Sequence, residues 1–112
     1  MHYTHKRRFV GVLAAAATAA LLVACVTVGR DFPATQVARL SIGTTTQEQV
    51  RGLFGTPWRT GVEDGQRTWT YGHYHYALLG NTQTRDLVVR FDEHGVLASY
   101  TFNSTNPDDA PR

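Results

Sequence analysis

The second half of the chain alternates between apolar and polar side chains, a pattern typical of β-strands with two different faces. A first strand is expected from Trp58 to Val62 and a second from Arg67 to Tyr76, with Trp69 and Tyr71 on one face. Apolar residues occupy every second position in two later segments: Leu87, Val89 and Phe91, then Val96, Ala98, Tyr100 and Phe102. Turn-forming sequences separate these segments, so the pattern predicts an antiparallel meander of three to four strands.

Before the strands, apolar residues are spaced as in a helix, most clearly between residues 45 and 55. The apolar stripe at positions i, i+3 and i+4 consists of Val50, Leu53 and Phe54. Thr45 and Glu48 fit a capping box, in which each side chain accepts a hydrogen bond from the other residue's backbone amide. Gly55 supplies a positive φ after the helix, and Pro57 prevents its continuation. This segment therefore predicts a helix with a defined start and end.

A shorter helix is expected just before it. Asp31 is suited to the N-cap, Pro33 is tolerated in a first turn, and Val37 and Leu40 are three positions apart on one face. The sequence Ser41-Ile42-Gly43 ends this helix. The whole pattern predicts an α+β fold, in which two short N-terminal helices pack on one face of the meander and water contacts the other.

The N-terminal segment has the plan of a secretory signal. Three basic residues, Lys6, Arg7 and Arg8, precede residues 9–28, which contain no charged side chain. A positive region, a short apolar region and small residues before the cleavage site are typical of signal peptides. Counted through Val28, the apolar run reaches the length of about 20 residues that a membrane span needs, so a retained anchor is the alternative.

The end of this apolar run, Leu22-Val23-Ala24-Cys25, resembles a bacterial lipobox. In that resemblance, a signal peptidase cuts before Cys25, whose thiol carries diacylglycerol and whose new amino group is then acylated. Cys25 is the only cysteine of the chain, so no intramolecular disulfide competes for it. Several acyl chains hold a protein on a membrane far more firmly than one chain does. Residues 1–24 are therefore expected to be removed, and Cys25 to be lipidated.

Removal of this segment changes the net charge of the chain. The whole chain has a net charge of +2, but residues 25–112 contain eight arginines, no lysine and nine acidic residues. A nucleic-acid-binding domain needs a basic face, so the mature domain is not expected to bind nucleic acid. The acidic residues fall mostly in predicted turns, and no serine lies in a nucleophile-elbow sequence. We therefore expect neither an enzyme nor a bound cofactor.

Several short motifs together resemble the SmpA/OmlA family of small outer-membrane lipoproteins, also called BamE-like. The motifs, in order, are Gly43-Thr44-Thr45-Thr46, Gln49-Val50, Phe54-Gly55-Thr56-Pro57, Trp69-x-Tyr71 and Phe91-Asp92-x-x-Gly95-Val96. The resemblance covers about residues 36–102. It implies two helices packed against a three-stranded antiparallel sheet. It also implies a role beside the machine that folds β-barrels into the outer membrane.

The segment His73-Tyr74-His75-Tyr76 is the most unusual local sequence. Gly72 decides which of these side chains face the core. A bulge there would turn both tyrosines toward the core, whereas a regular strand would turn both histidines inward. A metal site formed by His73, His75 and His94 is the less favoured interpretation, because no acidic residue or cysteine lies within the stretch. We predict no metal. The candidate interaction patch consists of Trp69, Tyr71, Tyr74 and Tyr76, with core packing of these aromatics as the alternative.

These observations predict four segments: a lipoprotein signal peptide (1–24), a lipidated tether (25–31), a BamE-like α+β domain (32–104) and a disordered tail (105–112). The predicted location is the outer membrane, with the domain facing the periplasm. The predicted function is that of a non-catalytic adaptor in β-barrel protein assembly or envelope integrity, with another envelope protein as partner. The alternative is an inhibitor or ligand-binding lipoprotein, because a similar helix-sheet unit is found in β-lactamase-inhibitor proteins.

Overall fold

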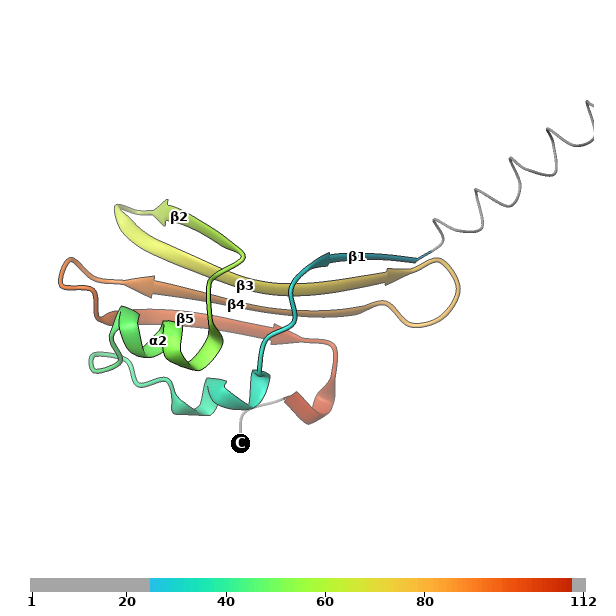
Figure 1. The fold of residues 1–112 in the computed structure, drawn as a ribbon, viewed down its shortest axis with the longest axis horizontal. Helices are drawn as coiled ribbons and strands as arrows, with labels where there is room; N and C mark the ends of the chain where they lie inside the picture. The colour runs from blue at the N-terminus through green and yellow to red at the C-terminus, as the bar shows by residue number, and fades with distance from the viewer. Residues whose placement is uncertain (1–24, 110–112) are drawn as a thin grey trace, which may run out of the picture.

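The computed structural model describes residues 25–109, which form a five-stranded antiparallel sheet with the helical segments on one face (Figure 1). The strands are β1 (Cys25–Gly29), β2 (Arg59–Glu63), β3 (Gln66–Ala77), β4 (Gln83–Phe91) and β5 (Leu97–Ser104). Strands β2, β3, β4 and β5 form the predicted meander, in which β4 pairs with one edge of β3. Strands β1 and β2 both pair with the other edge of β3, where β2 covers residues 66–70 and β1 covers residues 73–77.

The prediction of two N-terminal helices is only partly confirmed. Residues 25–109 contain one α-helix, α2 (Gln47–Phe54), while the first predicted helix is a 3₁₀ segment, η1 (Ala34–Arg39). Pro33 is the residue before η1, and no side chain caps it. The predicted N-cap, Asp31, instead accepts a hydrogen bond from the Phe32 amide at 2.9 Å. Without a cap and with extended backbone on both sides, this short segment does not extend into an α-helix.

The capping box of α2 exists, but it begins one residue later than predicted. The Thr46 hydroxyl accepts from the Gln49 amide, and the Gln49 side chain accepts from the Thr46 amide. Thr45 is bonded to the sheet instead, because its carbonyl accepts a hydrogen bond from the Leu97 amide at 2.7 Å. Its hydroxyl accepts from the Ser41 amide at 2.9 Å. Thr45 is therefore part of the connection to β5, and Thr46 is the first residue free to cap the helix.

The hydrophobic core lies between the helical segments and one face of the sheet, which we call the inner face. The buried apolar residues are Phe32, Ala34, Val37, Leu40, Val50, Phe54, Trp69, Tyr71, Leu87, Val89, Phe91 and Leu97. Leu97 was not among the predicted inward residues. The register shifts at Arg90 and Phe91, so that Ala98 is an extra residue in β5 and Leu97 turns inward opposite Phe91. After this irregularity the predicted alternation holds, and Tyr100 and Phe102 pack against the core.

Two segments predicted as a tether and a disordered tail contain secondary structure among the described residues. Residues 25–29 of the expected tether are β1, which pairs with an edge of β3 that would otherwise leave backbone amides and carbonyls unpaired. In the expected tail, the Thr105 amide donates to the Thr84 carbonyl at 2.9 Å, and Pro107–Asp109 form a 3₁₀ turn, η2. The predicted signal peptide, residues 1–24, and residues 110–112 lie outside the described residues. Between residues 25 and 109, no helix has both the length and the apolar character needed to cross a membrane.

Gly55 ends α2 in a backbone conformation that requires glycine. Its φ is +83° and its ψ is −159°, a region that residues with a Cβ atom avoid. Replacing Gly55 with valine should therefore lower the free energy of unfolding by about 1–3 kcal/mol, measured by urea denaturation. The matched control is Gly52→Ala inside α2, where an added Cβ meets no atom within 4 Å. This control should be stabilised by about 0.5–1 kcal/mol, and equal effects at both positions would contradict the prediction.

Candidate functional site

The predicted aromatic patch is divided between the two faces of the sheet. The pairing of β3 with β4 continues without a shift through Gly72, so Gly72 forms no bulge. Trp69, Tyr71, His73 and His75 consequently share the inner face, and Tyr74 and Tyr76 lie on the opposite, outer face. Of the two alternatives that the sequence left open, the regular strand is correct.

Trp69 and Tyr71 belong to the core and therefore drop out of the interaction patch. Their exposed fractions are 6% and 3%. Trp69 packs edge-to-face on Phe91 with ring centroids 4.9 Å apart. Tyr71 donates its hydroxyl hydrogen to the Gly55 carbonyl at 2.8 Å, which joins the sheet to the end of α2. Burial raises the pKa of Tyr71 to about 12, although the Arg51 charge opposes this effect, so the phenol stays a hydrogen-bond donor.

Tyr74 and Tyr76 form part of a continuous apolar surface on the outer face. Their rings stack with centroids 6.4 Å apart, and the Trp58 ring lies 6.0 Å from that of Tyr74. In the pairing of β1 with β3, Val28 lies opposite Tyr74 and Val26 opposite Tyr76. We call these five residues the outer aromatic face. Val26 and Tyr76 are each 48% exposed, so this surface is available for contact with another molecule.

Gly72 allows the Tyr74 ring to lie flat against the sheet. A Cβ atom at Gly72 would come within 2.6 Å of the Tyr74 ring, so only glycine leaves room for it. Burial is the main cause that raises the pKa of Tyr74, and the nearby Asp86 carboxylate adds to it, while Arg59 opposes it. Asp86 lies opposite Gly72 on β4, and burial raises its pKa although a hydrogen bond with Asn103 lowers it. A partly desolvated acid therefore lies on the strand next to Tyr74.

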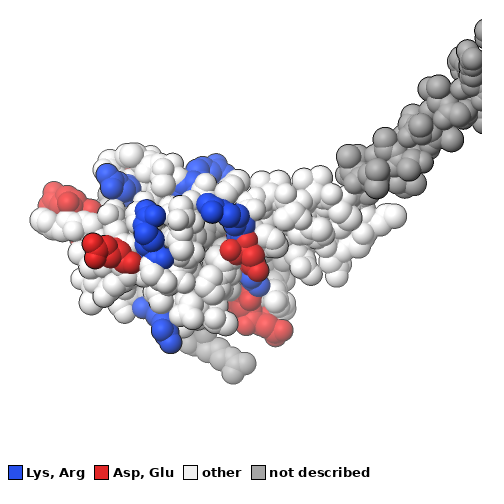
Figure 2. Space-filling model, in the orientation of Figure 1, with Lys and Arg blue, Asp and Glu red and all other residues white. Residues whose placement is uncertain are grey.

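Charged side chains are concentrated away from this surface. Figure 2 shows arginine, aspartate and glutamate side chains over the part of the molecule that carries β2 and α2, whereas the part near the start of β1 is white. The sequence explains this difference, because residues 25–29 and 72–84 contain no charged side chain. Arg59 marks the border, with its guanidinium 4.5 Å from the centroid of the Trp58 ring. The five residues of the outer aromatic face are thus uncharged, and the charged residues Arg59 and Asp86 lie next to them.

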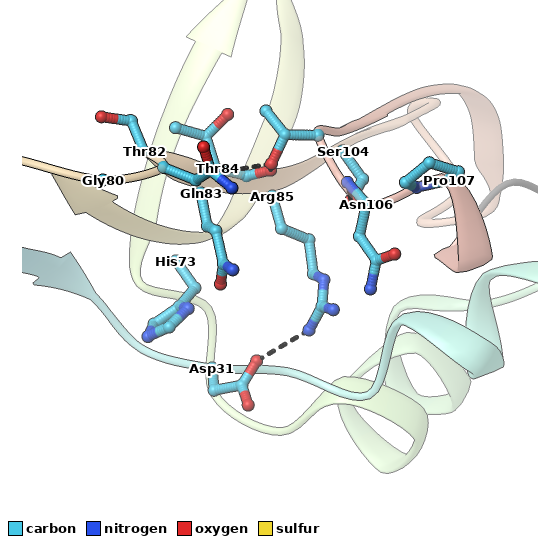
Figure 3. Close-up of a pocket in the computed structure, with 12 residues that line it drawn as sticks. Asp31, His73, Gly80, Thr82, Gln83, Thr84, Arg85, Ser104, Asn106 and Pro107 are labelled. Carbon is cyan, nitrogen blue, oxygen red and sulfur yellow. Dashed lines mark hydrogen bonds and ion pairs between the residues drawn. The ribbon is translucent and has the colours of Figure 1, made fainter. Parts of the chain in front are cut away.

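The inner face beyond the helices holds a polar hollow (Figure 3). Arg85 enters it from β4 and forms ion pairs with Asp31 at 3.0 Å and with Asp109 at 2.8 Å. His73 lies on the adjacent strand, and the hollow is bounded on its other side by Asn106. Two carboxylates already neutralise the Arg85 charge, so this hollow does not present a free cation to an anionic ligand.

Among residues 25–109, no three histidine, cysteine or acidic side chains cluster in a way that could hold a metal ion. His75 Nδ1 is in hydrogen-bond contact with Thr27 Oγ1 at 2.8 Å, which ties β3 to β1. His94 lies in the turn between β4 and β5, beside Glu93 at 3.4 Å. That turn is at the opposite end of β3 from His73 and His75, so the three histidines do not meet.

The Asp109 ion pair predicts an acid-sensitive attachment of the C-terminal segment. Desolvation alone would raise the Asp109 pKa, but hydrogen bonds from Ser104 and Arg85 and the Arg85 charge lower it overall. A lowered folded-state pKa stabilises the segment above the unfolded value of about 3.9 and loses this effect as the pH falls through the folded value. Hydrogen exchange at the Thr105 amide should therefore accelerate below about pH 4 relative to core amides.

Asp109→Asn should produce the same loss of protection at neutral pH, since it removes the charge that Arg85 contacts. Asp108→Asn is the matched control, because Asp108 is an exposed neighbour and forms no ion pair among the described residues. Equal exchange at Thr105 in both variants would show that the ion pair does not hold the segment.

Sequence reasoning missed three contributors to the outer aromatic face. Val26 and Val28 alternate with Thr27, a period-two signal that was interpreted as the end of the signal peptide and the start of a tether. Trp58 was assigned to a strand without a stated face. The contact between Trp58 and Tyr74 joins positions on two separate segments, and no local pattern predicts it.

Comparison with known proteins identifies the domain. Residues 32–101 match the family described as outer membrane protein assembly factor BamE domain. This range begins after β1 and ends within β5, so β1 and η2 lie outside the matched region. A search of curated proteins gives no match to the chain. The match confirms the resemblance found in the sequence motifs, and it covers most of the chain: this protein belongs to the BamE domain family.

Proposed function

We propose that this protein is a lipid-anchored, non-catalytic adaptor in the assembly of outer-membrane proteins. The observation that carries the proposal is the family match over residues 32–101, whose description names an outer membrane protein assembly factor. In this proposal Cys25 holds the acyl chains, the domain faces the periplasm, and its partner is a subunit of the assembly machinery. A lipid anchor would raise the effective concentration of the domain near such a membrane-embedded partner.

The state of Cys25 is consistent with lipidation. Cys25 is free and exposed at the first position of β1, so its thiol is accessible. It follows Leu22-Val23-Ala24, the lipobox sequence. Since β1 begins at this residue, cleavage before Cys25 would leave the whole described sheet intact.

The outer aromatic face is the proposed contact surface for the protein partner. Tyrosine and tryptophan are over-represented at the energetic centres of protein interfaces, where they bury large rigid surfaces. Tyr74 and Tyr76 stack on each other, and the sheet holds them in place, so little side-chain entropy is lost on binding. Asp86, opposite Gly72 on the neighbouring strand β4, would add a polar contact beside this surface. The helical segments cover the other face of the sheet, which leaves the outer face available for a partner.

The lipidation of Cys25 is tested by replacing it with serine, which has no thiol to accept the lipid. Cys25→Ser should accumulate as an unprocessed precursor, seen as a larger mass in whole-cell immunoblots. Thr27→Ser is the control, because it lies beyond the lipobox and should be processed normally. A shortened product from Cys25→Ser would contradict the proposed anchor.

The adaptor function is tested by recovering tagged, full-length protein from mildly solubilised outer membrane and identifying its partners by mass spectrometry. The wild-type protein should recover the barrel-assembly machinery in near-stoichiometric yield. Tyr76→Ala should reduce this recovery at least about tenfold, since truncated interface centres cost 2 kcal/mol or more. Ile42→Ala, at a 61% exposed position outside the outer aromatic face, should not. Recovery of a soluble envelope enzyme instead would favour the inhibitor function and overturn the adaptor.

A further inference from the structure

The loop that joins β3 to β4 exposes two leucines. Leu78 is 78% exposed and Leu79 is 89% exposed, the highest values among the large apolar side chains between residues 25 and 109. The loop continues with Gly80, and no charged residue occurs between Gly72 and Thr84. Exposed leucines together in an uncharged segment usually mark a surface that another apolar phase covers.

The position of this loop relative to Cys25 indicates what covers it. Cys25 pairs with Ala77, the last residue of β3, so it is a direct neighbour of the residue before Leu78. Figure 1 shows the start of β1 beside the turn between β3 and β4. Acyl chains attached to Cys25 would therefore leave the protein next to both leucines, and a membrane that receives the chains would lie against this loop.

The opposite end of β3 provides a comparison within the same molecule. There β2 ends at Glu63, and Asp64 and Gly65 form the turn to β3. Glu63 forms an ion pair with Arg90 at 3.0 Å, and the neighbouring strand ends carry further charges. Charged loops are costly to place at the apolar boundary of a membrane, whereas an uncharged loop with two leucines is favourable there. The uncharged end of β3 near Cys25 is therefore suited to contact with a membrane, and the charged end is not.

We propose that the β3–β4 loop inserts into the membrane leaflet that holds the Cys25 acyl chains, with Leu78 and Leu79 as the inserting side chains. This inference rests on the proposed lipidation of Cys25. Only the side chains reach the acyl boundary, because loop backbone cannot leave its amides and carbonyls unpaired in hydrocarbon. Tyr76, two residues before Leu78 and 48% exposed, is then at the level of the headgroups, where tyrosine is favoured. The lipid anchor and the loop are two points of contact, and together they restrict rotation of the domain about the anchor.

The test uses full-length, lipidated protein with one added thiol. Cys25 is the only cysteine of the chain and is consumed by the lipid, so Leu79→Cys provides a single site for an environment-sensitive fluorophore. The labelled protein is reconstituted into phosphatidylcholine vesicles that contain a spin-labelled lipid quencher. The fluorophore at position 79 should shift to shorter wavelength and lose at least half of its intensity. Val62→Cys, at a 75% exposed position on β2, is the matched control and should do neither.

The remaining outcomes separate this inference from the proposed anchor. Mass spectrometry of the N-terminal peptide and flotation of the vesicles report lipidation in the same samples. A lipidated protein that floats but is not quenched at position 79 overturns insertion of the loop and leaves the anchor in place. An unlipidated protein that does not float overturns the anchor, and the inference with it. A wavelength shift at position 79 without quenching means that this chain or a second copy of it covers the loop, which also overturns membrane insertion.

Discussion

Replacing Phe91 with alanine should lower the free energy of unfolding by about 3–5 kcal/mol, because it leaves a large cavity in the centre of the core. Phe91 has no exposed surface and lies opposite Leu97 at the register shift of β5. Its ring also packs edge-to-face against Trp69, with ring centroids 4.9 Å apart, and alanine loses this contact. Since small domains have total stabilities of about 5–15 kcal/mol, the variant should be partly unfolded at 37 °C.

Urea denaturation followed by tryptophan fluorescence measures this loss, because Trp69 reports on the packing next to the substitution. Val62→Ala is the control at a 75% exposed position, and its stability should stay within about 0.5 kcal/mol of the wild-type value. A loss below about 1 kcal/mol for Phe91→Ala would show that the core closes over the cavity, contrary to the packing described.

A substitution of Gly29 by alanine should detach β1 from β3 while leaving the rest of the sheet folded. A Cβ atom at Gly29 would lie 2.1 Å from the Gly72 carbonyl oxygen, which is backbone and cannot move aside. The same oxygen accepts the Arg30 amide at 2.8 Å, so the clash also breaks the hydrogen bond that continues the pairing. In addition, Gly29 has a φ of +84°, which disfavours any residue with a side chain.

Hydrogen exchange detects this detachment, because the β1 amides should exchange at least about a hundredfold faster while amides of β4 keep their protection. Gly43→Ala is the matched control: Gly43 has a φ of +86°, but an added Cβ meets no atom within 4 Å. It should cause backbone strain without changing the exchange of β1. Unchanged β1 exchange in Gly29→Ala would mean that the close approach of the two glycines is not required for pairing.

The sequence predicted the parts of the fold that depend on local signals. The helix at Val50 and Phe54, its glycine stop and the alternation in β3 and β4 are all confirmed by burial. The helix start was one residue early, because the hydrogen bond from Leu97 that holds Thr45 to β5 is not visible in the local sequence. The same is true of β1, since Thr27 and His75 are 48 positions apart and their pairing has no local signal.

The candidate site was predicted less well, for a related reason. Trp69, Tyr71, Tyr74 and Tyr76 were grouped because they are neighbours in sequence, but a regular strand sends the first two and the last two to opposite faces. The outer partners of Tyr74 and Tyr76 come from β1 and from Trp58, on separate segments of the chain. A composition argument identifies an aromatic-rich region, and only the pairing of strands shows which rings reach the surface.

The length of β3 has a consequence for the reach of an anchored domain. Strand β3 contains 12 residues, so at about 3.4 Å per residue its two ends are about 40 Å apart. If Cys25 is acylated beside the Ala77 end, the charged turn after Glu63 lies at a distance from the bilayer of up to the length of β3. A flexible linker would let this turn move freely relative to the anchor, whereas a continuous strand fixes the distance between them. In the proposed anchored orientation, a partner that meets the charged end would have to extend about this far from the bilayer, and one that meets Tyr76 would lie close to the membrane surface.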